Sequence, residues 1–305
     1  MPELPEIETI VEGAKKRLIG KKIKSVEIRV PKIIGGEVNI FKKGVEGARI
    51  VGVCRFAKII VIDFSNNNSI LIHLKLTGQL IYQRKIKNQK SKITNKISNH
   101  KSQISKNHFL GGHPSRVYDQ PLPHNYTHVI FTFADGSHLY FNDIRRFGYL
   151  KLVKTKEVEE RPEIKNLGPE PLDGWTYKDF KSRLERRPRS KIKQVLMDQK
   201  FVSGIGNIYA NEILFYAKVS PLHNVGDLTE DQKKQIFKSI QFILKKGIAM
   251  GGSSENTYVN FEGKKGDFMR YAKVYRKDSC KVCGGPIKRI VIGGRGTFYC
   301  PECQK

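Results

Sequence analysis

The sequence lacks any run of about 18 consecutive apolar residues, the length that a membrane-spanning helix needs. Apolar residues make up 39% of its 305 residues, an ordinary fraction for a chain that folds around a buried core. Its first residues are acidic and no short apolar segment follows them, so we expect no secretory signal peptide. These absences predict a cytoplasmic protein with no membrane partner.

Acidic residues are scarce. The chain has 29 Asp and Glu against 56 Lys and Arg, which gives a formal net charge of +27. A field of that sign attracts polyanions, and nucleic acid is the commonest polyanionic partner. An anionic membrane surface is the alternative, but we find no basic amphipathic helix with a wide apolar face to lie on it.

Cysteine is scarce except near the end of the chain. Four of the five cysteines form two C-x-x-C pairs, Cys280/Cys283 and Cys300/Cys303. That spacing predicts one tetrahedral zinc ion held by four thiolates, with a glycine-containing hairpin between the pairs. Two disulfides are the alternative, but disulfides are rare in a chain without an export signal.

The chain opens with Met1, Pro2 and Glu3, and a second carboxylate follows at Glu6. Removal of Met1 would leave Pro2 with a free amine, and α-amino groups titrate near about pH 8, so part of it is unprotonated at neutral pH. Such an amine can attack an electrophilic carbon and form a Schiff base, with the two carboxylates as proton carriers. An ordinary helix start, with proline and acidic residues in its first turn, is the alternative interpretation.

Hydrophobic periodicity predicts an N-terminal domain over residues 1–153. Apolar residues on one face predict a helix over 5–19, and from residue 21 short alternating segments between turns predict a β-sandwich. Residues 84–120 interrupt this pattern with a stretch rich in Lys, Asn and Ser, and we expect a mobile surface insertion there.

A linker is expected over residues 154–170, followed by a helical domain over 171–264. Two helices, 189–200 and 208–218, flank the turn Gly204-Ile205-Gly206-Asn207. The free N–H groups at the start of the second helix suit a phosphate, although such a turn also occurs as a simple packing element.

Further along the chain, Thr229 and Gln232 have the spacing of a capping box, which predicts a helix running to residue 251. Residues 253–270 are polar and contain glycine, so we expect a loop there. The zinc module over 265–305 closes the chain.

Arg145 and Phe147 lie next to Gly148, just after a predicted strand. A loop that presents a cation beside an aromatic ring suits insertion into a base stack, since apolar wedges open stacked bases. Lys58, at the start of another predicted strand, would on its own be read as a solvated lysine.

Taken in order, these motifs resemble those of bacterial formamidopyrimidine-DNA glycosylases. The matching segments are Pro-Glu-Leu-Pro-Glu at 2–6, the context of Lys58, His73–Gly78, Arg145–Gly148, Leu167–Pro171, Gly204–Glu212 and the four-cysteine finger. The resemblance implies an α+β fold of two domains, with an N-terminal β-sandwich flanked by helices and a C-terminal helix-two-turn-helix domain carrying a β-hairpin zinc finger.

The resemblance also implies an activity, base excision repair by a bifunctional DNA glycosylase and AP lyase. Such an enzyme removes oxidised purines, 8-oxoguanine and formamidopyrimidines, through a Schiff base followed by β,δ-elimination. The implied partner is damaged double-stranded DNA, the implied cofactor is one structural zinc ion, and the implied state is a monomer.

Roles carry over to matching positions. Pro2 matches the nucleophile, Glu3 the proton donor in base removal, Lys58 the proton donor in β-elimination, and Arg295 the finger arginine of phosphate binding and δ-elimination. Glu6 matches a further acidic active-site residue.

The implied DNA contacts form a second group. Leu76, Arg145 and Phe147 match the three residues that fill the gap left by an extruded nucleotide. Lys193 and Asn207 match DNA contacts around the helix-two-turn-helix. Tyr126 stands at a position where relatives often carry a DNA-contacting histidine. Leu76 stands where methionine is usual, so the plug keeps apolar bulk without a flexible thioether. The loop over 253–270 matches the segment that closes over the extruded base.

Two rival interpretations stay open. An endonuclease VIII-type enzyme would act on oxidised pyrimidines, but that group usually opens Pro-Glu-Gly-Pro-Glu, whereas Leu4 stands here. A non-catalytic zinc protein that binds DNA would need the basic surface and the finger, yet it has no use for Pro2, Glu3 and Lys58 together.

Overall fold

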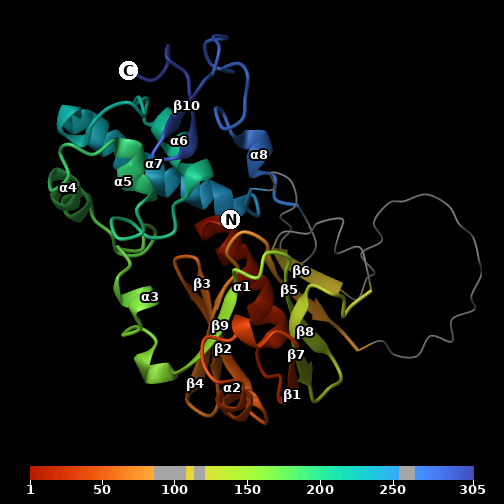
Figure 1. Cartoon of the computed structure of the whole chain (residues 1–305). Helices are drawn as coiled ribbons and strands as arrows, with labels where there is room; N and C mark the ends of the chain where they lie inside the picture. Colours follow the sequence, from red (N-terminus) through yellow and green to blue (C-terminus); the bar gives the residue numbers. More distant parts are fainter. Residues whose placement is uncertain (86–107, 113–120, 254–264) are drawn as a thin grey trace, which may run out of the picture.

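The computed structural model describes the chain apart from residues 86–107, 113–120 and 254–264. Figure 1 shows a β-sandwich below a helical domain, with the zinc-finger hairpin at the far end of the helical domain. The N-terminus lies at the junction between the two domains. The first residues of the chain therefore lie where both domains can contact them.

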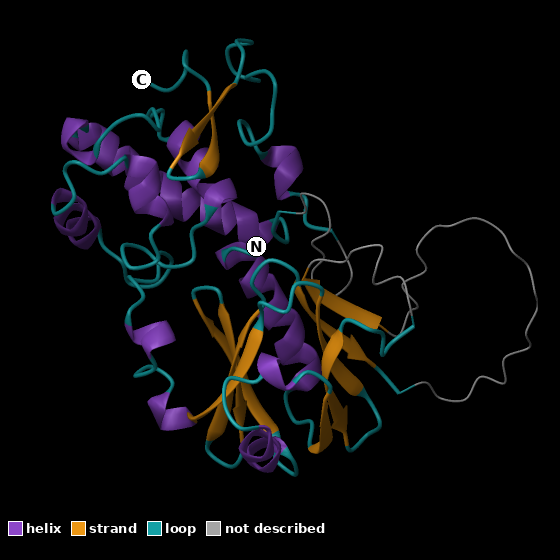
Figure 2. Cartoon of the chain, viewed as in Figure 1, coloured by secondary structure: helices purple, strands orange, loops and turns teal. Residues whose placement is uncertain are grey.

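Two antiparallel sheets form the sandwich within the described residues (Figure 2). Their inward side chains are almost all aliphatic or aromatic, which is the alternation that the sequence predicts for a sandwich core. One sheet has the order β1-β7-β8-β5-β6, with strands Ile23–Ile28, Thr127–Phe133, His138–Asp143, Gly78–Gln83 and His108–Gly112. The other has the order β2-β3-β4-β9, with strands Ile50–Phe56, Ile59–Phe64, Asn68–His73 and Tyr149–Lys154.

Helix α1 (Leu4–Leu18) joins the two hydrophobic cores. Its apolar face from Ile7 to Leu18 packs in the sandwich core, together with side chains from both sheets. Leu4, one turn earlier, packs instead in the core of the helical domain. One amphipathic helix therefore contributes to both domains and fixes its own N-terminus between them.

The helical domain packs around Trp175, the single tryptophan of the chain. Phe180, Phe201 and Phe237 meet its ring edge-on, with centroids 5.4 to 6.3 Å away. Edge-to-face contacts of this kind add to the free energy of burying the rings. The helices of the domain are α4 (Tyr177–Glu185), α5 (Ile192–Met197), α6 (Asn207–Tyr216), α7 (Glu230–Ala249) and α8 (Phe268–Tyr271), with α3 (Pro162–Lys165) in the connection from the sandwich.

The zinc-finger hairpin pairs β10 (Lys288–Ile292) with β11 (Arg295–Tyr299). Gly293 and Gly294 form its two-residue turn, and both have positive φ, at 57° and 71°. Positive φ at both loop residues is the requirement of a type I′ turn, which glycine meets without steric cost. The sequence prediction of a hairpin with its tip at these two glycines is confirmed.

Most predicted elements are confirmed, and five predictions need correction, the last of which concerns the insertion over 84–120. Residues 38–45, expected within a run of strands, form α2 (Val38–Val45), which buries Phe41 and Val45. The helix expected over 189–200 is shorter and forms α5, Ile192–Met197. Pro188 and Ser190 precede it, and it ends at Asp198, whose backbone is extended. The linker contains helical turns, and the loop predicted over 253–270 contains α8.

The predicted insertion over 84–120 is wrong in part, since β6 lies inside it and pairs with β5 at the sheet edge. Its remaining residues, 86–107 and 113–120, lie outside the described residues, as does most of the loop expected to close over a base. Among the helices that the structure describes, none combines the length and the apolarity needed to cross a membrane.

Candidate active site and nucleic-acid interface

The carboxylate of Glu3 joins the start of the chain to the start of α6. It accepts hydrogen bonds from the backbone N–H groups of Gly206 at 2.7 Å, Ile208 at 2.9 Å and Tyr209 at 3.4 Å. These N–H groups have no partner within the helix, and an anion at a helix N-terminus is favoured by the helix dipole. Leu4 N–H donates back to the Gly204 carbonyl at 3.0 Å. Pro2, next to Glu3, is buried at the same junction.

The glycines of the turn before α6 are required by this close approach. A Cβ on Gly206 would lie 2.4 Å from the Glu3 carboxyl carbon. Gly204 has φ +86°, and a Cβ there would lie 2.6 Å from a Leu4 methyl. The turn predicted to bind phosphate therefore receives a carboxylate of its own chain, and glycine leaves the space for it.

The pKa of Glu3 is raised to about 7, mainly by burial and also by the neighbouring Glu6 charge. The Lys58 charge and the Ile208 N–H oppose this shift. The carboxyl therefore exchanges a proton near neutral pH. A buried acid that titrates in this range suits proton transfer to a leaving group.

Glu6 is the second buried carboxylate of the junction. One oxygen accepts the Glu3 N–H at 2.7 Å, which completes a capping box on α1. The other oxygen accepts the Tyr209 hydroxyl at 2.7 Å, the Ser253 N–H at 2.6 Å and the Ser253 hydroxyl at 3.0 Å. Glu6 therefore links the first turn of α1 to the first turn of α6 and to the segment after α7.

Lys58 lies in the two-residue turn between β2 and β3, where Phe56 pairs with Ile59. Ala57 supplies the positive φ, +51°, that such a turn needs. The turn directs Lys58 into the domain junction, where its Nζ donates to the Ile205 carbonyl at 2.8 Å. Burial lowers the pKa of Lys58, while Glu3 and Glu6 oppose that shift. The interpretation of a solvated lysine is wrong, because this side chain is only 5% exposed.

The finger hairpin approaches the same place from the other side. Arg295, exposed at the hairpin turn, interacts electrostatically with both Lys58 and Lys193. Lys193 is fully buried, and its Nζ donates to the Gly296 carbonyl at 3.0 Å and the Thr297 hydroxyl at 2.7 Å. Asn207 donates to the same Gly296 carbonyl at 3.1 Å. Lys193 and Asn207 thus hold the hairpin that carries Arg295.

The protonation of Lys193 is also perturbed. Burial lowers the pKa of its ammonium to about 8, with the Glu3 charge opposing and the Arg295 charge reinforcing that shift. In this structure its donors point to the finger, so its expected contact with DNA stays a prediction.

Asp143 organises a second cluster on the sandwich. It is fully buried, and one oxygen accepts the Thr77 hydroxyl and the Arg145 N–H, the latter at 3.1 Å. The other oxygen accepts the N–H groups of Phe147 at 2.9 Å and Gly148 at 2.8 Å. One carboxylate therefore connects the turn after β4 to the turn after β8.

These two turns present the three residues expected to fill a gap in a base stack. Leu76 is 40% exposed and Phe147 is 56% exposed, a large exposure for apolar side chains. The Arg145 guanidinium lies 4.9 Å from the centre of the Phe147 ring. The structure thus brings together side chains that are far apart in the sequence, and it leaves them open to a partner.

Tyr126 belongs to this second cluster. Its carbonyl accepts the Asp143 N–H at 3.0 Å, and its ring meets His124 edge-on at 6.1 Å.

His73 lies at the end of β4, where its Nδ1 accepts the Lys75 N–H at 3.0 Å. Burial lowers the pKa of His73 to about 3, with Lys75 and Lys58 adding to the shift, so this imidazole is neutral.

The four predicted zinc ligands come together at the far end of the finger. The Sγ atoms of Cys280, Cys283, Cys300 and Cys303 all lie within 4.8 Å of one another. Four thiol groups at that spacing fit one tetrahedral zinc ion. The cluster is a site for one structural zinc.

Sequence reasoning gave no role to several residues that organise these sites. Asp143, Tyr209 and Ser253 all stand in or beside recognised motifs, but their hydrogen bonds depend on chain segments that meet only in the fold. Glu212 is another, since its buried carboxylate accepts three consecutive N–H groups from Lys273 to Tyr275. A short acidic residue before an Arg-Arg-Phe-Gly turn was the available signal for Asp143.

Comparisons with known proteins agree with this geometry over the whole chain. Residues 1–150 match the formamidopyrimidine-DNA glycosylase N-terminal domain, residues 167–259 its H2TH domain, and residues 278–305 the zinc finger found in FPG and IleRS. Formamidopyrimidine-DNA glycosylases of Desulforamulus reducens and Listeria monocytogenes are each 37% identical to the chain. The alignments cover 100% of this chain and 99% and 100% of the two relatives.

Solved structures agree as well. The Lactococcus lactis FPG mutant G226P in complex with a Fapy-dG containing DNA superposes with a TM-score of 0.83, at 30% identity over 100% of both chains. The Lactococcus lactis Fpg bound to an abasic site containing DNA gives 0.82, at 30% identity over 99% of both chains. The three domain matches, the full-length relatives and this superposition show that the chain belongs to the formamidopyrimidine-DNA glycosylase family.

Proposed function

We propose that this protein excises oxidised purines from duplex DNA and then cleaves the resulting abasic site. The observation that carries the proposal is the buried junction where Pro2, Glu3 and Lys58 meet the start of α6. An amine, an acid that titrates near neutral pH and a lysine of lowered pKa are the groups that a glycosylase and lyase requires. The relatives' names and their complexes with Fapy-dG and abasic DNA support the purine branch.

The reaction begins once Met1 is removed. Its removal frees the Pro2 nitrogen, which lies in the buried junction beside Glu3. The Pro2 nitrogen attacks C1′, the bond from C1′ to the base breaks, and Glu3 delivers a proton to the departing base. Opening of the sugar ring then leaves an iminium ion between Pro2 and C1′.

Strand cleavage follows from that iminium ion, because it acidifies the C2′ proton. The Glu3 carboxylate, ionised once it has protonated the departing base, accepts this proton. The 3′ phosphate then leaves in β-elimination, with Lys58 as proton donor, and δ-elimination expels the 5′ phosphate. Arg295 neutralises phosphate charge in these steps. The buried lysine transfers protons readily because its pKa is lowered.

The second cluster opens the helix. A base within a duplex is out of reach, so the enzyme must extrude it and fill the vacated stack. Leu76, Arg145 and Phe147 offer an aliphatic, a cationic and an aromatic group from one rigid support. We assign these three side chains to that gap. We also propose that the protein acts as a monomer on chromosomal DNA in the bacterial cytoplasm.

Pro2→Gly tests the nucleophile. Borohydride trapping on an 8-oxoguanine duplex should fall by about 10²-fold or more, because glycine presents a flexible primary amine in place of the fixed secondary amine of proline, and a misplaced reacting group costs about that much. Wild-type trapping on a thymine-glycol duplex should be weaker than on 8-oxoguanine. Binding to an uncleavable tetrahydrofuran duplex, the control, should be unchanged in the variant. Undiminished trapping, or a mature protein that keeps Met1 and still cuts, would contradict the assignment.

Glu3 predicts a pH profile. Single-turnover excision of 8-oxoguanine should fall about tenfold per pH unit above the pKa of about 7, since only the protonated acid donates. Glu3→Gln should slow excision by about 10² to 10⁴-fold and abolish that descending limb, while cleavage of a preformed abasic site persists. A variant that keeps the wild-type limb would exclude Glu3 as its source.

Asp143→Asn tests the support of the gap-filling residues. The amide places N–H donors against backbone donors. Such a loss costs about 1–3 kcal/mol, which corresponds to about 5 to 150-fold slower excision from duplex. Cleavage of an abasic site in single-stranded DNA needs no stack to be opened and should stay at the wild-type rate. Asp63→Asn, which changes a carboxylate on β3 in the other sheet, is the matched control and should alter neither rate.

Zinc removal tests the finger. The hairpin should lose its anchor, so affinity for the tetrahydrofuran duplex should fall by about tenfold or more, since phosphate contacts dominate such binding. Circular dichroism should show the sandwich still folded, because the cysteine cluster lies outside its core. A metal-free protein that nicks lesion duplex at the normal rate would show that the finger is dispensable.

A further inference from the structure

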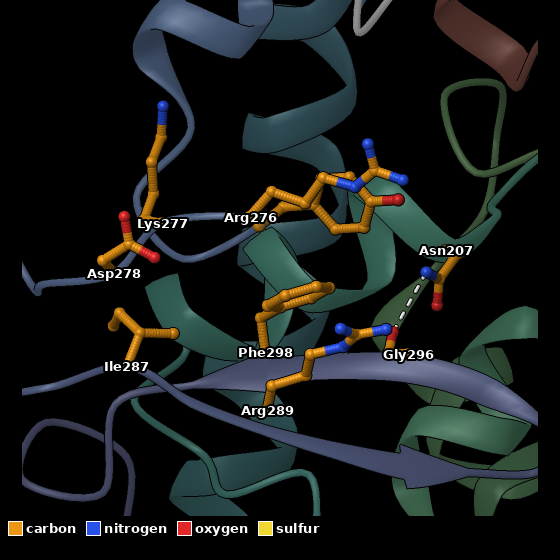
Figure 3. Close-up of a pocket in the computed structure, with 9 residues that line it drawn as sticks. Asn207, Arg276, Lys277, Asp278, Ile287, Arg289, Gly296 and Phe298 are labelled. Carbon is orange, nitrogen blue, oxygen red and sulfur yellow. Dashed lines mark hydrogen bonds between the residues drawn. The ribbon is translucent and has the colours of Figure 1, made fainter.

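A groove lies between the zinc-finger hairpin and the chain segment that leads into it (Figure 3). Its volume is about 470 Å³, and its walls come from residues 275–278 on one side and from β10 and β11 on the other. Asn207, at the start of α6, lines one end. The groove therefore begins at the expected DNA-binding turn and extends away from the Glu3 junction along the finger.

Helix α6 fixes both walls of this groove. Glu212 accepts the N–H groups of Lys273, Val274 and Tyr275 at 2.7 to 3.0 Å, which anchors the first wall. Asn211 accepts the Phe298 N–H at 2.8 Å, and Asn207 donates to Gly296, which anchors the hairpin. Polar side chains of one helix hold the two walls apart, so the groove exists before any ligand binds.

The charge of the lining favours an anion. Arg276 and Lys277 extend from one wall and Arg289 from the other, against a single acidic residue, Asp278. Phe298 lies between Arg276 and Arg289 in Figure 3, and the Arg289 guanidinium is 5.9 Å from its ring centre. Guanidinium groups on two facing walls suit a phosphodiester, which accepts hydrogen bonds on both of its free oxygens.

Arg276 adopts an unusual backbone conformation. Its φ is +53°, in the left-handed region that favours glycine, and it is one of few non-glycine residues there among those the structure describes. An arginine in that region lowers stability relative to glycine, and such residues cluster at binding sites. The side chain itself, exposed on the groove wall, is the reason we offer for the strained position.

We infer that this groove binds a backbone phosphate of the DNA outside the lesion site, through Arg276 and Arg289. The inference rests on the proposed function, since it takes the bound polymer to be lesion DNA. It assigns the groove a share of affinity and salt dependence and no part in the chemistry. It also gives a reason for the hydrogen bonds by which α6 holds residues 275–278 and the finger hairpin as two separate, positively charged walls.

The test compares Arg276→Gly with Lys218→Gly. Lys218 is also exposed and also has positive φ, +58°, but it does not line the groove. Both variants lose one positive charge and one left-handed side chain, so both should unfold at the wild-type Tm or about 2 °C above it. Only Arg276→Gly should weaken binding to a tetrahydrofuran duplex, by about tenfold at ~0.1 M salt, and reduce the salt slope by about 1.

Substitution of single phosphates locates the contact. Neutral methylphosphonates are placed one at a time along the duplex. At one position the substitution should weaken the binding of wild-type protein, and at that same position it should not change the affinity of Arg276→Gly or Arg289→Ala. Equal affinity and slope for Arg276→Gly and wild type, or equal losses in both glycine variants, would overturn the inference. The inference would also be overturned if Arg276→Gly changed only the inhibition by inorganic phosphate and the methylphosphonates had the same effect on wild type and variant at every position of the duplex.

The proposed function has a separate criterion. If wild-type protein shows no preference for the tetrahydrofuran duplex over intact duplex, the assignment to lesion repair fails, whatever the groove variants do. If that preference is strong and unaltered by Arg276→Gly, only the groove assignment fails.

Discussion

The bond between the Glu3 carboxylate and the first N–H groups of α6 determines the geometry of the rest of the molecule. It places the second and third residues of the chain against residues 206–209, so the proposed nucleophile lies at the junction of two domains. A buried carboxylate without partners would be costly, and the open end of α6 supplies the partners that it needs. The same bond requires glycine at 206 and a helix that enters both hydrophobic cores.

Buried carboxylates play one recurring part in a chain that has few acidic residues. Glu3, Glu6, Asp143 and Glu212 each accept several hydrogen bonds, mostly backbone N–H groups of loops or helix starts. An anion that accepts from several N–H groups holds a loop in one conformation, because each bond limits the same backbone. The excess of Lys and Arg over Asp and Glu in the whole chain gives the positive field that attracts a polyanion.

The two clusters that we propose act on DNA are built on different supports. The reactive groups lie where the domains meet, and the gap-filling side chains lie on sandwich turns joined by Asp143. The finger adds Arg295 and the cationic groove, and α6 holds it through Asn207, Asn211 and Glu212. One short helix therefore receives Glu3 at its start and holds the finger through polar side chains, so it links the proposed catalytic junction to the finger.

The sequence by itself determined the local features of this protein. The two C-x-x-C pairs, the β-sandwich pattern, the hairpin at Gly293-Gly294 and the capping box at Thr229 follow from short-range chemistry, and the structure has all of them. The ordered motifs also indicated the family. Only the tertiary structure decided that Lys58 is buried, that Lys193 holds the finger and that Asp143 joins two turns. Burial and hydrogen-bond partners depend on segments far apart in the chain, and periodicity, which reports only neighbouring residues, carries no information about them.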